Sequence, residues 1–472
     1  MLLFLLSFPL VAGGLAFLLP GRRSRNTIML LVALAHSLCV VSFWKWTPAV
    51  TLNGFLALDA LGLLVLSVIS VLFLMVSIYL TGYFKNEPDI SHRVFIAFLL
   101  FFLSFMTLVT MSRHFGLLLI GIEATTLSSV PLINLERTRE SIEATWKFLM
   151  ICLIGIALAL LGTYFLAVSA MDIQTIFIDK LLIHAKELSL PWLKMSAIFL
   201  LIGCGTKMGL APMHTWLPDA HSQAPSPVSA LLSGCLLNCA FLSVLRVGQV
   251  CYAAGQMPFF SSMLILLGII SMGVAYVFIL GQEDYKRMFA YSSVEHMGIL
   301  VLGVGLGGIG IYGSLLHLIN NAFTKGFIFL ITGNLYRQYH SKKVNSVRGL
   351  FQRIPITGVL LLAGFLAICG APPFGTFISE LIILYSAIAG QHYVVAVLYV
   401  LFLALIFMGI ADIILKMTQT PSAESDRVTP AKESWSMIAP ILFLVLIVLG
   451  IGLYIPHFLN KALHDAAALL GG

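Results

Sequence analysis

The chain has 472 residues, of which 60% are hydrophobic and only 10% are charged, and its mean hydropathy is +1.01. So many apolar side chains cannot be buried beneath the surface of a water-soluble protein, which excludes a soluble globular domain. The formal net charge of +7 comes from basic residues at the ends of apolar segments. This distribution argues against nucleic-acid binding and indicates a membrane-spanning chain.

Apolar segments long enough to cross a bilayer as helices follow one another along the chain. At roughly 20 residues a crossing, they predict about fourteen helices. We expect these helices to begin near Leu2, Ile28, Phe55, Val94, Phe115, Phe148, Leu193, Val228, Phe260, Met288, Ile311, Thr357, Tyr393 and Met437. The first segment differs from a secretory signal because its arginines follow the apolar run, so we interpret it as a retained helix. The sequence therefore predicts an all-α, polytopic membrane protein.

Basic residues gather in alternate loops, which the positive-inside rule assigns to the cytoplasm. They are Arg22, Arg23, Arg25, Lys85, Arg93, Arg137, Arg139, Lys286, Arg287, Arg337, Lys342, Lys343, Arg348, Arg353, Lys416, Arg427 and Lys432. The opposite loops carry almost no basic residues, apart from Lys180, Lys186 and Lys194 in one longer excursion. Both termini are therefore predicted on the outer side of the membrane.

Glycine and proline interrupt two of the apolar segments, at residues 209–212 and 370–375. The prolines at these breaks are Pro212, Pro372 and Pro373. Proline removes a backbone donor, so each break leaves carbonyl groups that water, side chains or ions must satisfy. A charged residue lies near each break, Lys207 at the first and Glu380 at the second. Paired breaks of this kind are typical of internal repeats with one ion site in each.

Lys207 lies inside an otherwise apolar stretch, where a lysine is energetically costly and usually functional. Glu123 lies well inside another predicted helix, and Lys207 is its expected partner. While the carboxylate is close, the lysine keeps its proton; when the pair separates, burial favours loss of the proton. The alternative is a static ion pair that ties two helices together.

His317, Asn321 and Lys325 share one face of a predicted helix, which favours a line of proton-accepting and hydrogen-bonding groups. A lone buried histidine is usually structural, but one that shares its helix face with an intramembrane lysine favours a proton relay. Glu380 follows the second break and is expected to hold the proton before its release. The alternative role for Glu380 is stabilisation of a helix N-terminus.

Four further polar residues are candidates for an accessory role. Glu295 and His296 follow a basic pair by about two turns, so they form either a hydrated cytoplasmic access or a polar packing cluster. His214 and His221 follow the first break and are expected near the cytoplasmic mouth.

The chain has seven cysteines and no Cys-x-x-Cys pair. Cys235 and Cys239 lie one helical turn apart, which fits helix packing better than iron–sulfur or zinc ligation. There is also no Walker loop, dinucleotide fingerprint, haem-attachment motif or nucleophile elbow. We therefore predict no metal site and no redox cofactor in this chain.

Three spaced motifs, at residues 207–225, 286–298 and 317–329, carry a resemblance to a known family. They read Lys-x4-Pro-x-His-x-Trp-Leu-Pro-Asp-Ala-His-x2-Ala-Pro, Lys-Arg-x2-Ala-Tyr-Ser-Ser-x2-His-Met-Gly and His-x7-Lys-Gly-x-x-Phe. The chain resembles the antiporter-like proton-translocating subunits shared by respiratory complex I, energy-converting membrane-bound hydrogenases and Mrp sodium/proton antiporters. The resemblance covers the third to the thirteenth predicted helix.

The resemblance implies fourteen helices with two inverted five-helix repeats. The corresponding segments are 1–93 for the first three helices, 94–248 for the first repeat, 259–417 for the second repeat and 435–472 for the last helix. In such subunits a glutamate, matched by Glu123, modulates a lysine, matched by Lys207. A central histidine then leads to a last relay residue, matched by Glu380.

The chain also departs from the family pattern. Asn238 stands where many relatives carry a lysine, and Asn321 where they carry a second histidine. Amides order water but hold no proton, so the relay is expected to depend more on water, His317 and Lys325. The run Ser-Ser-Val-Glu-His-Met-Gly, with Glu295, resembles the hydrogenase-4 and formate-hydrogenlyase type of subunit more than the complex I form.

The leading hypothesis is therefore a proton-translocating subunit of a redox-driven complex in the cytoplasmic membrane of a prokaryote. Its expected partners are other membrane subunits and a peripheral redox arm, whose subunits carry iron–sulfur clusters with nickel-iron or flavin. The chain is then the transport part of an oxidoreductase. Two alternatives stay open: an Mrp-like sodium/proton antiporter with Glu123, Glu295 and Asp59 as sodium ligands, and a non-conducting structural subunit, motivated by Asn238 and Asn321.

Overall fold

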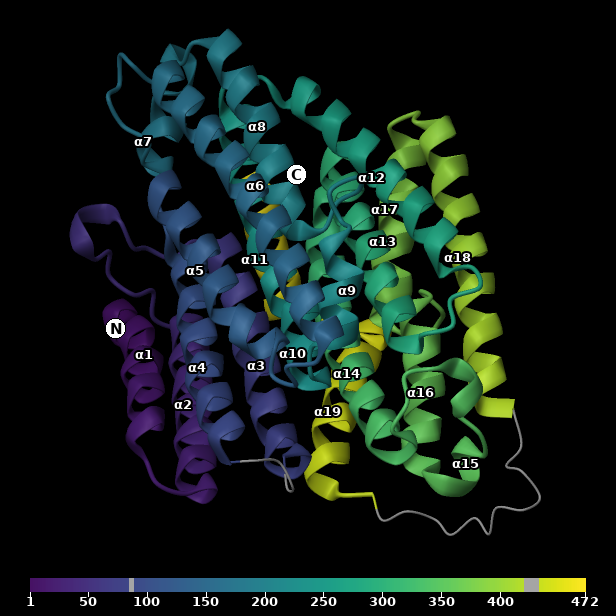
Figure 1. Ribbon diagram of the computed structural model, residues 1–472. Helices are drawn as coiled ribbons and strands as arrows, with labels where there is room; N and C mark the ends of the chain where they lie inside the picture. Colours follow the sequence, from purple (N-terminus) through teal and green to yellow (C-terminus); the bar gives the residue numbers. More distant parts are fainter. Residues whose placement is uncertain (85–88, 420–432) are drawn as a thin grey trace.

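A computed structural model describes residues 1–84, 89–419 and 433–472, without the side chains of residues 89–91. The described chain consists of helices joined by turns and loops (Figure 1). Three of the basic residues used above to orient the chain, Lys85, Arg427 and Lys432, lie outside the described residues.

The helices of the first half, up to the end of α11, are α1 (Leu2–Leu18), α2 (Arg22–Phe43), η1 (Leu52–Gly54), α3 (Ala60–Tyr83), α4 (Asp89–Met111), α5 (Phe115–Ile133), α6 (Arg139–Ser169), α7 (Ile178–Ile183), η2 (Ala185–Glu187), α8 (Leu190–Met208), α9 (Trp216–Gln223), α10 (Ser226–Leu231), η3 (Leu232–Leu236) and α11 (Leu237–Ala253). Those of the second half are α12 (Met257–Ile279), α13 (Tyr285–Leu306), α14 (Ile309–Tyr339), η4 (Val344–Ser346), α15 (Leu350–Arg353), α16 (Pro355–Ile368), α17 (Gly375–Ala389), α18 (Tyr393–Gln419), α19 (Trp435–Leu453) and α20 (His457–Ala468).

The all-α, polytopic prediction is confirmed. Among the described residues, 11 helical segments are long and apolar enough to cross a membrane, and α1, α16 and α17 are shorter apolar helices. This composition does not confirm the predicted number of about fourteen crossings.

Several helices begin away from the predicted residues because capping side chains set their first turns. The third helix begins at Ala60, after Phe55, since Asp59 Oδ1 accepts a hydrogen bond from the Gly62 N–H at 2.9 Å. The sixth begins well before Phe148, since Thr138 Oγ1 accepts from the Ser141 N–H at 3.1 Å. Hydropathy locates the apolar part of a helix but misses a polar first turn.

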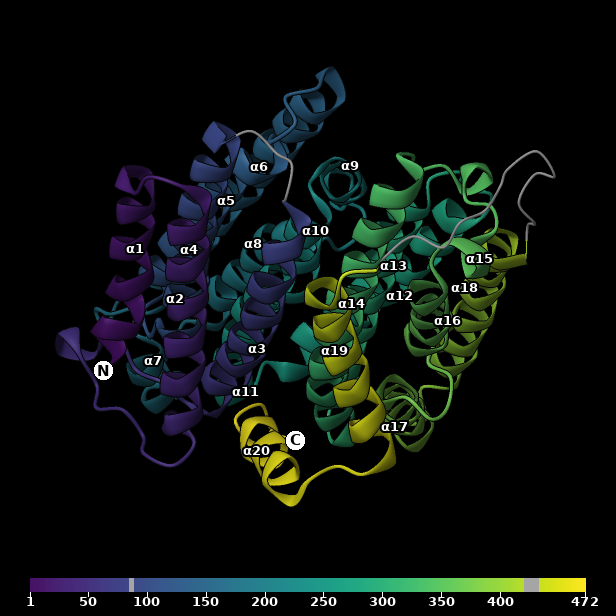
Figure 2. The same cartoon turned by 90° about the horizontal axis from the view of Figure 1, so that it is seen from below.

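The helices form two halves beside a central region (Figures 1 and 2). The N-terminal helices α1 to α4 lie on one side, and α12, α16 and α18 lie on the other. Helices α13 and α14 lie in the centre, and α14 packs against both α17 and α19. Nearly every side chain of α13 and α14 is buried, whereas outer helices such as α18 expose apolar residues. Polar residues on α13 and α14 are therefore shielded from both water and lipid.

The two chain ends lie at the same end of the bundle. Leu2 packs with Phe43 and Leu56, and Gly472 lies beside Gly308, so both termini lie near loops with few basic residues. At the opposite end, Arg22 donates a hydrogen bond to the Phe84 carbonyl at 2.6 Å. The basic loops and the termini thus occupy opposite ends of the described structure.

Both Gly-Pro sequences lie between helices. Helix α8 ends at Met208, where Gly209 adopts a left-handed conformation with φ of 81°, and the chain turns before α9. Helix α16 ends at Ile368, and Gly370, with φ of 57°, precedes α17. Positive φ values of this kind favour glycine. Each break places a charged side chain, from the end of α8 and from α17, next to an interrupted helix.

Candidate functional site

Lys207 lies in the last turn of α8, with only 3% of its surface exposed. Its Nζ donates to Thr126 Oγ1 at 2.7 Å and approaches Cys152 Sγ at 3.9 Å. The Phe148 ring lies below the ammonium at 4.4 Å from its centroid, and the Trp216 ring at 5.9 Å. Aromatic faces stabilise a buried cation by about 0.5–2 kcal/mol, which only partly offsets the desolvation of the ammonium group.

The predicted contact between Lys207 and Glu123 is indirect. In the described structure no oxygen of Glu123 lies within 4.0 Å of the lysine nitrogen; Thr126 lies between them and donates to Glu123 Oε2 at 3.4 Å. The static ion pair considered from the sequence is therefore absent in this conformation. Thr126 follows Glu123 by three residues on α5, so both side chains lie on the same helix face. The Thr126 hydroxyl therefore occupies the position next to the Lys207 ammonium and separates it from the Glu123 carboxylate.

A small cavity adjoins this first cluster. It is lined by Glu123, Cys152, Cys204 and Lys207, among others, and its volume is about 10 Å³. That is about the space that one water molecule needs. The cavity lies where α6 and α8 approach closely, since a Cβ on Gly203 would collide with the backbone of α6. The carboxylate and the lysine thus share a polar pocket.

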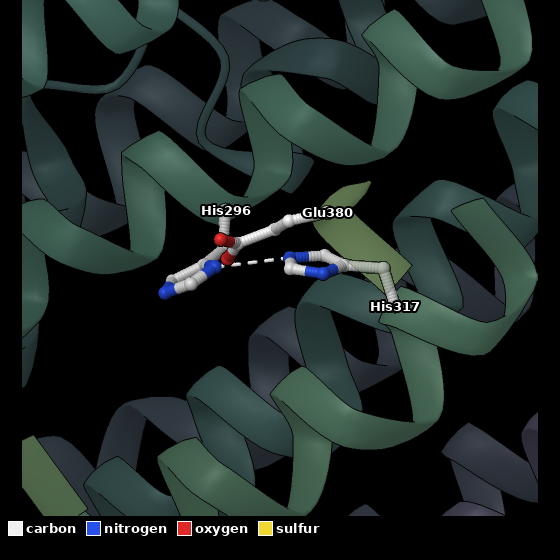
Figure 3. Close-up of side chains that lie close together, drawn as sticks. All are labelled: His296, His317 and Glu380. Carbon is white, nitrogen blue, oxygen red and sulfur yellow. Dashed lines mark hydrogen bonds between the residues drawn. The ribbon is translucent and has the colours of Figure 1, made fainter. Parts of the chain in front are cut away.

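A second cluster joins α13, α14 and α17 (Figure 3). His296 Nδ1 and His317 Nε2 share a hydrogen bond of 3.0 Å, and His317 Nδ1 bonds Ser379 Oγ at 2.9 Å. The carboxylate of Glu380 lies beside the His296 ring, and its Oε1 has no hydrogen-bond partner in the described part of the chain. Both histidines are fully buried, and Glu380 is 7% exposed. Sequence reasoning placed His296 at an access site or in a packing cluster, whereas the structure places it next to the central histidine.

Lys325 and Glu295 lie close to this second cluster. Lys325 Nζ donates to Ser292 Oγ at 2.5 Å and to the Phe289 carbonyl at 3.5 Å, and its side chain is fully buried. The charges of Glu295 and Lys325 act on one another, yet no oxygen of Glu295 lies within ion-pair distance of the lysine among the described side chains. Like Lys207, this lysine is held by a hydroxyl group.

The expected line of groups along α14 is not continuous. His317 bonds across to α13 and α17, Lys325 bonds to α13, and the amide of Asn321 between them has no partner among the described residues. Asn238 donates to the Gly234 carbonyl at 2.8 Å, within the π-helical turn η3. Among the described residues, neither amide has a hydrogen bond to a charged group.

The remaining candidates lie around these clusters. His221 is fully buried and stacks on the Phe329 ring, with centroids 5.1 Å apart, and His214 is 6% exposed. Both are more enclosed than residues at a cytoplasmic mouth would be. Cys235, in the π-helical turn η3, and Cys239, in α11, are buried free thiols. Ser233 and Ser293 bond one another at 2.8 Å between the two halves.

The three carboxylates considered as sodium ligands do not gather. Among the described residues, His296, His317 and Glu380 form the one group of at least three potential ligands whose donor atoms lie close together. Asp59 instead accepts hydrogen bonds from Arg246, which is fully buried, and from Arg113 at 2.9 Å. Burial acts to raise the pKa of Asp59, but the two arginines outweigh it and hold the pKa well below its usual range. Asp59 is thus a cap and an ion-pair partner.

Three hydroxyl groups that contact the clusters were not identified from the sequence. Thr126 and Ser292 hold the two lysines, and Ser379 orients His317. Ser and Thr are frequent on membrane helices, where they usually bond the backbone one turn away. The only sequence signal was their spacing: Thr126 lies three residues after Glu123, and Ser379 directly precedes Glu380.

Comparison with known proteins places the amino-acid sequence in a family. The family described as NADH:quinone oxidoreductase/Mrp antiporter, TM matches residues 112–406. The hydrogenase-4 component F homolog of Methylacidiphilum infernorum (isolate V4) is 33% identical over 460 residues, which cover 94% of this chain and 94% of the relative. The residues of both clusters fall within the segment that the family model matches, residues 112–406: Lys207, His296, His317, Lys325 and Glu380.

Two solved structures have the same fold. One is in the membrane-bound sulfane sulfur reductase, an archaeal respiratory membrane complex, with a TM-score of 0.91 and 20% identity over 100% of this chain and 97% of that one. The other is in the Mrp complex from Dietzia sp. DQ12-45-1b, with a TM-score of 0.88 and 19% identity over the same shares. At these identities the likeness establishes the fold alone.

Proposed function

Because the chain belongs to the NADH:quinone oxidoreductase/Mrp antiporter family of membrane subunits, we propose that it translocates protons in a redox-driven complex of the hydrogenase-4 or complex I type. The protons pass through the two buried clusters. Other membrane subunits surround the chain, and a peripheral redox arm carries the iron–sulfur clusters with nickel-iron or flavin. The protein lies in the cytoplasmic membrane of a prokaryote with both termini outside, since the basic loops lie at the other end.

The observation that carries this proposal is the way Lys207 is held. A structural lysine in a membrane is expected to pair with a carboxylate. Here its short contact is the Thr126 hydroxyl, and Glu123 is one hydrogen bond further away. A small movement of Glu123 toward or away from Lys207 would therefore change how strongly the lysine holds its proton. This arrangement suits a group that binds and releases a proton during turnover.

The second cluster provides the exit. In the described structure Lys325 donates to Ser292 and Phe289 and to neither ring, so a proton from Lys325 would reach the His296–His317 pair through water. Each imidazole can accept a proton at one nitrogen and donate from the other. Glu380, beside the rings and with a free oxygen, accepts the proton last. Release then occurs toward the end of the bundle that holds the termini.

The test uses proteoliposomes that contain the complex purified through this subunit. Lys207→Ala should abolish proton translocation while partner redox chemistry continues in part. Lys194→Ala is the matched control, since Lys194 is an exposed lysine of the same helix, and it should pump like the unaltered protein. Unchanged pumping in Lys207→Ala would contradict the proposal.

Two further measurements separate the alternatives. Glu380→Gln tests the release step, because an amide accepts no proton, and pumping should stop there too. Sodium-dependent pH changes in vesicles without a redox substrate would favour a sodium/proton antiporter. If variants of Glu123, Lys207 and Glu380 all pumped normally, the chain would be a structural subunit.

A further inference from the structure

The His296, His317 and Glu380 side chains lie close enough together to share one metal ion (Figure 3). Their donor atoms all lie within 4.8 Å of one another, and the two imidazole nitrogens are 3.0 Å apart. In a tetrahedral zinc site with bonds of about 2.0 Å, neighbouring ligand atoms are about 3.3 Å apart. The sequence pointed to no metal site because the three ligands come from α13, α14 and α17 and form no local motif.

We propose that this cluster is a Zn²⁺ site, with His296 Nδ1, His317 Nε2 and a carboxylate oxygen of Glu380 as ligands. Two imidazoles and one carboxylate form the ligand set of zinc sites with an open fourth position. Two neutral nitrogen donors favour zinc or a similar borderline metal ion over sodium or magnesium, which prefer oxygen.

Two further contacts fit a metal site. The other nitrogen of His317, Nδ1, bonds Ser379 Oγ at 2.9 Å, and a ligating histidine is usually held in this way by its second nitrogen. The Glu380 carboxylate lies against Gly370, where a Cβ would overlap with it, and its Oε1 lacks a partner in the described structure. The glycine thus leaves the space that the Glu380 carboxylate, foremost its Oε2, occupies.

The surrounding charges also suit a divalent ion. When it ligates the metal, Glu380 contributes one negative charge, and the Glu295 carboxylate acts electrostatically on Glu380 from α13. Two ionised carboxylates would balance the charge of Zn²⁺, and Lys325 acts electrostatically on Glu295. Access is expected beside the break that precedes α17, since Glu380 is the most exposed of the three ligands, at 7%.

Zinc in this position would occupy the same nitrogen and oxygen atoms that carry the proton in the proposed function, so bound zinc should inhibit proton translocation. Only this expected inhibition rests on the proposed function. Binding itself does not depend on it. If zinc were bound while pumping continued at full rate, the relay through His317 would be contradicted and the metal site would stand.

The experiment measures Zn²⁺ binding to the full-length chain, purified with its partners through a tag without histidine. After removal of metal with a chelator, zinc content is measured by equilibrium dialysis for the unaltered protein, His296→Gln, Glu380→Gln and the control His392→Gln, an exposed histidine. We expect binding to weaken at least about tenfold in the first two variants and to stay unchanged in the control. Equal binding in all four proteins would overturn the proposal.

X-ray absorption at the zinc edge tests the unaltered protein directly, so a variant that fails to fold does not decide the outcome. The expected spectrum contains two imidazole ligands and one oxygen ligand from the protein. A spectrum of oxygen ligands alone would overturn the site.

Discussion

Buried charges occur in two regions of this molecule, and they are satisfied in opposite ways. At the end of the bundle near the termini, Asp59 meets Arg246 and Arg113, so each charge has a partner of opposite sign. In the bundle interior, Lys207 and Lys325 donate to hydroxyl groups instead. Burial alone therefore does not mark a functional charge. What distinguishes the interior is that neither lysine has an ion-pair partner among the described residues, which leaves their protonation free to change.

The largest expected effect on stability comes from breaking the paired region. Asp59→Ala would leave the fully buried guanidinium of Arg246 without its counter-ion, which costs about 3–5 kcal/mol. Unfolding of the full-length chain in mild detergent measures this change. Asp412→Ala is the control, because Asp412 pairs with Lys416 on an exposed surface, where a pair contributes about 0–1 kcal/mol. If both variants lost the same stability, the cluster around Asp59 would not be structural.

The same pair predicts a pH dependence. Since the arginines lower the pKa of Asp59 below its usual range against the effect of burial, the ionised form stabilises the fold. That contribution is complete above the pKa of an unfolded aspartate, about 3.9, and is lost as the pH falls toward the lower folded-state value. The difference in stability between the unaltered protein and Asp59→Asn should therefore be constant above about pH 5 and shrink only in stronger acid. A difference that already fell near neutral pH would contradict the ion-pair assignment.

Lys207→Met tests the opposite region. The substitution removes a charge that has no fixed counter-ion and keeps an apolar chain of similar length between the Phe148 and Trp216 rings. Replacing a buried charge by an apolar residue is often neutral or stabilising, so the unfolding free energy should fall by no more than about 1 kcal/mol. A loss as large as that of Asp59→Ala would mean that Lys207 holds the fold together.

The smallest expected effect is on the orientation of His317. Ser379→Ala removes the hydrogen bond to Nδ1, which contributes about 1 kcal/mol and corresponds to about a fivefold slower proton transfer. Ser386→Ala on the same helix is the control, because Ser386 bonds the Gly307 carbonyl away from the cluster. Translocation rates in proteoliposomes compare the two. Equal rates would show that Ser379 does not position the ring.

Local features of the sequence were sufficient to predict the helical class, the two breaks and the charged residues beside them. Glycine and proline interrupt a helix wherever they occur, and a lysine in an apolar segment is visible without a structure. The exact first turns were missed at α3 and α6, where a polar cap precedes the apolar run.

The partners of these charges could not be predicted, because they depend on which helix faces meet. Glu295 and His296 are neighbours in sequence, yet His296 bonds the histidine of α14 while Glu295 acts on Lys325. Asp59 was considered as a sodium ligand, but two arginines from distant segments occupy its oxygens. Tertiary packing decides whether a buried carboxylate is paired or free.

The most direct test of the comparison is the number of protons translocated per redox turnover, measured side by side for complexes with Lys207→Met and with Asp59→Asn and normalised to folded protein. We expect Lys207→Met to fold normally and to translocate almost no protons. The Asp59→Asn complex should be recovered in lower yield, and its folded fraction should translocate protons at the unaltered ratio. Normal translocation by Lys207→Met, together with uncoupling by Asp59→Asn, would contradict the assignment of function to the unpaired charges.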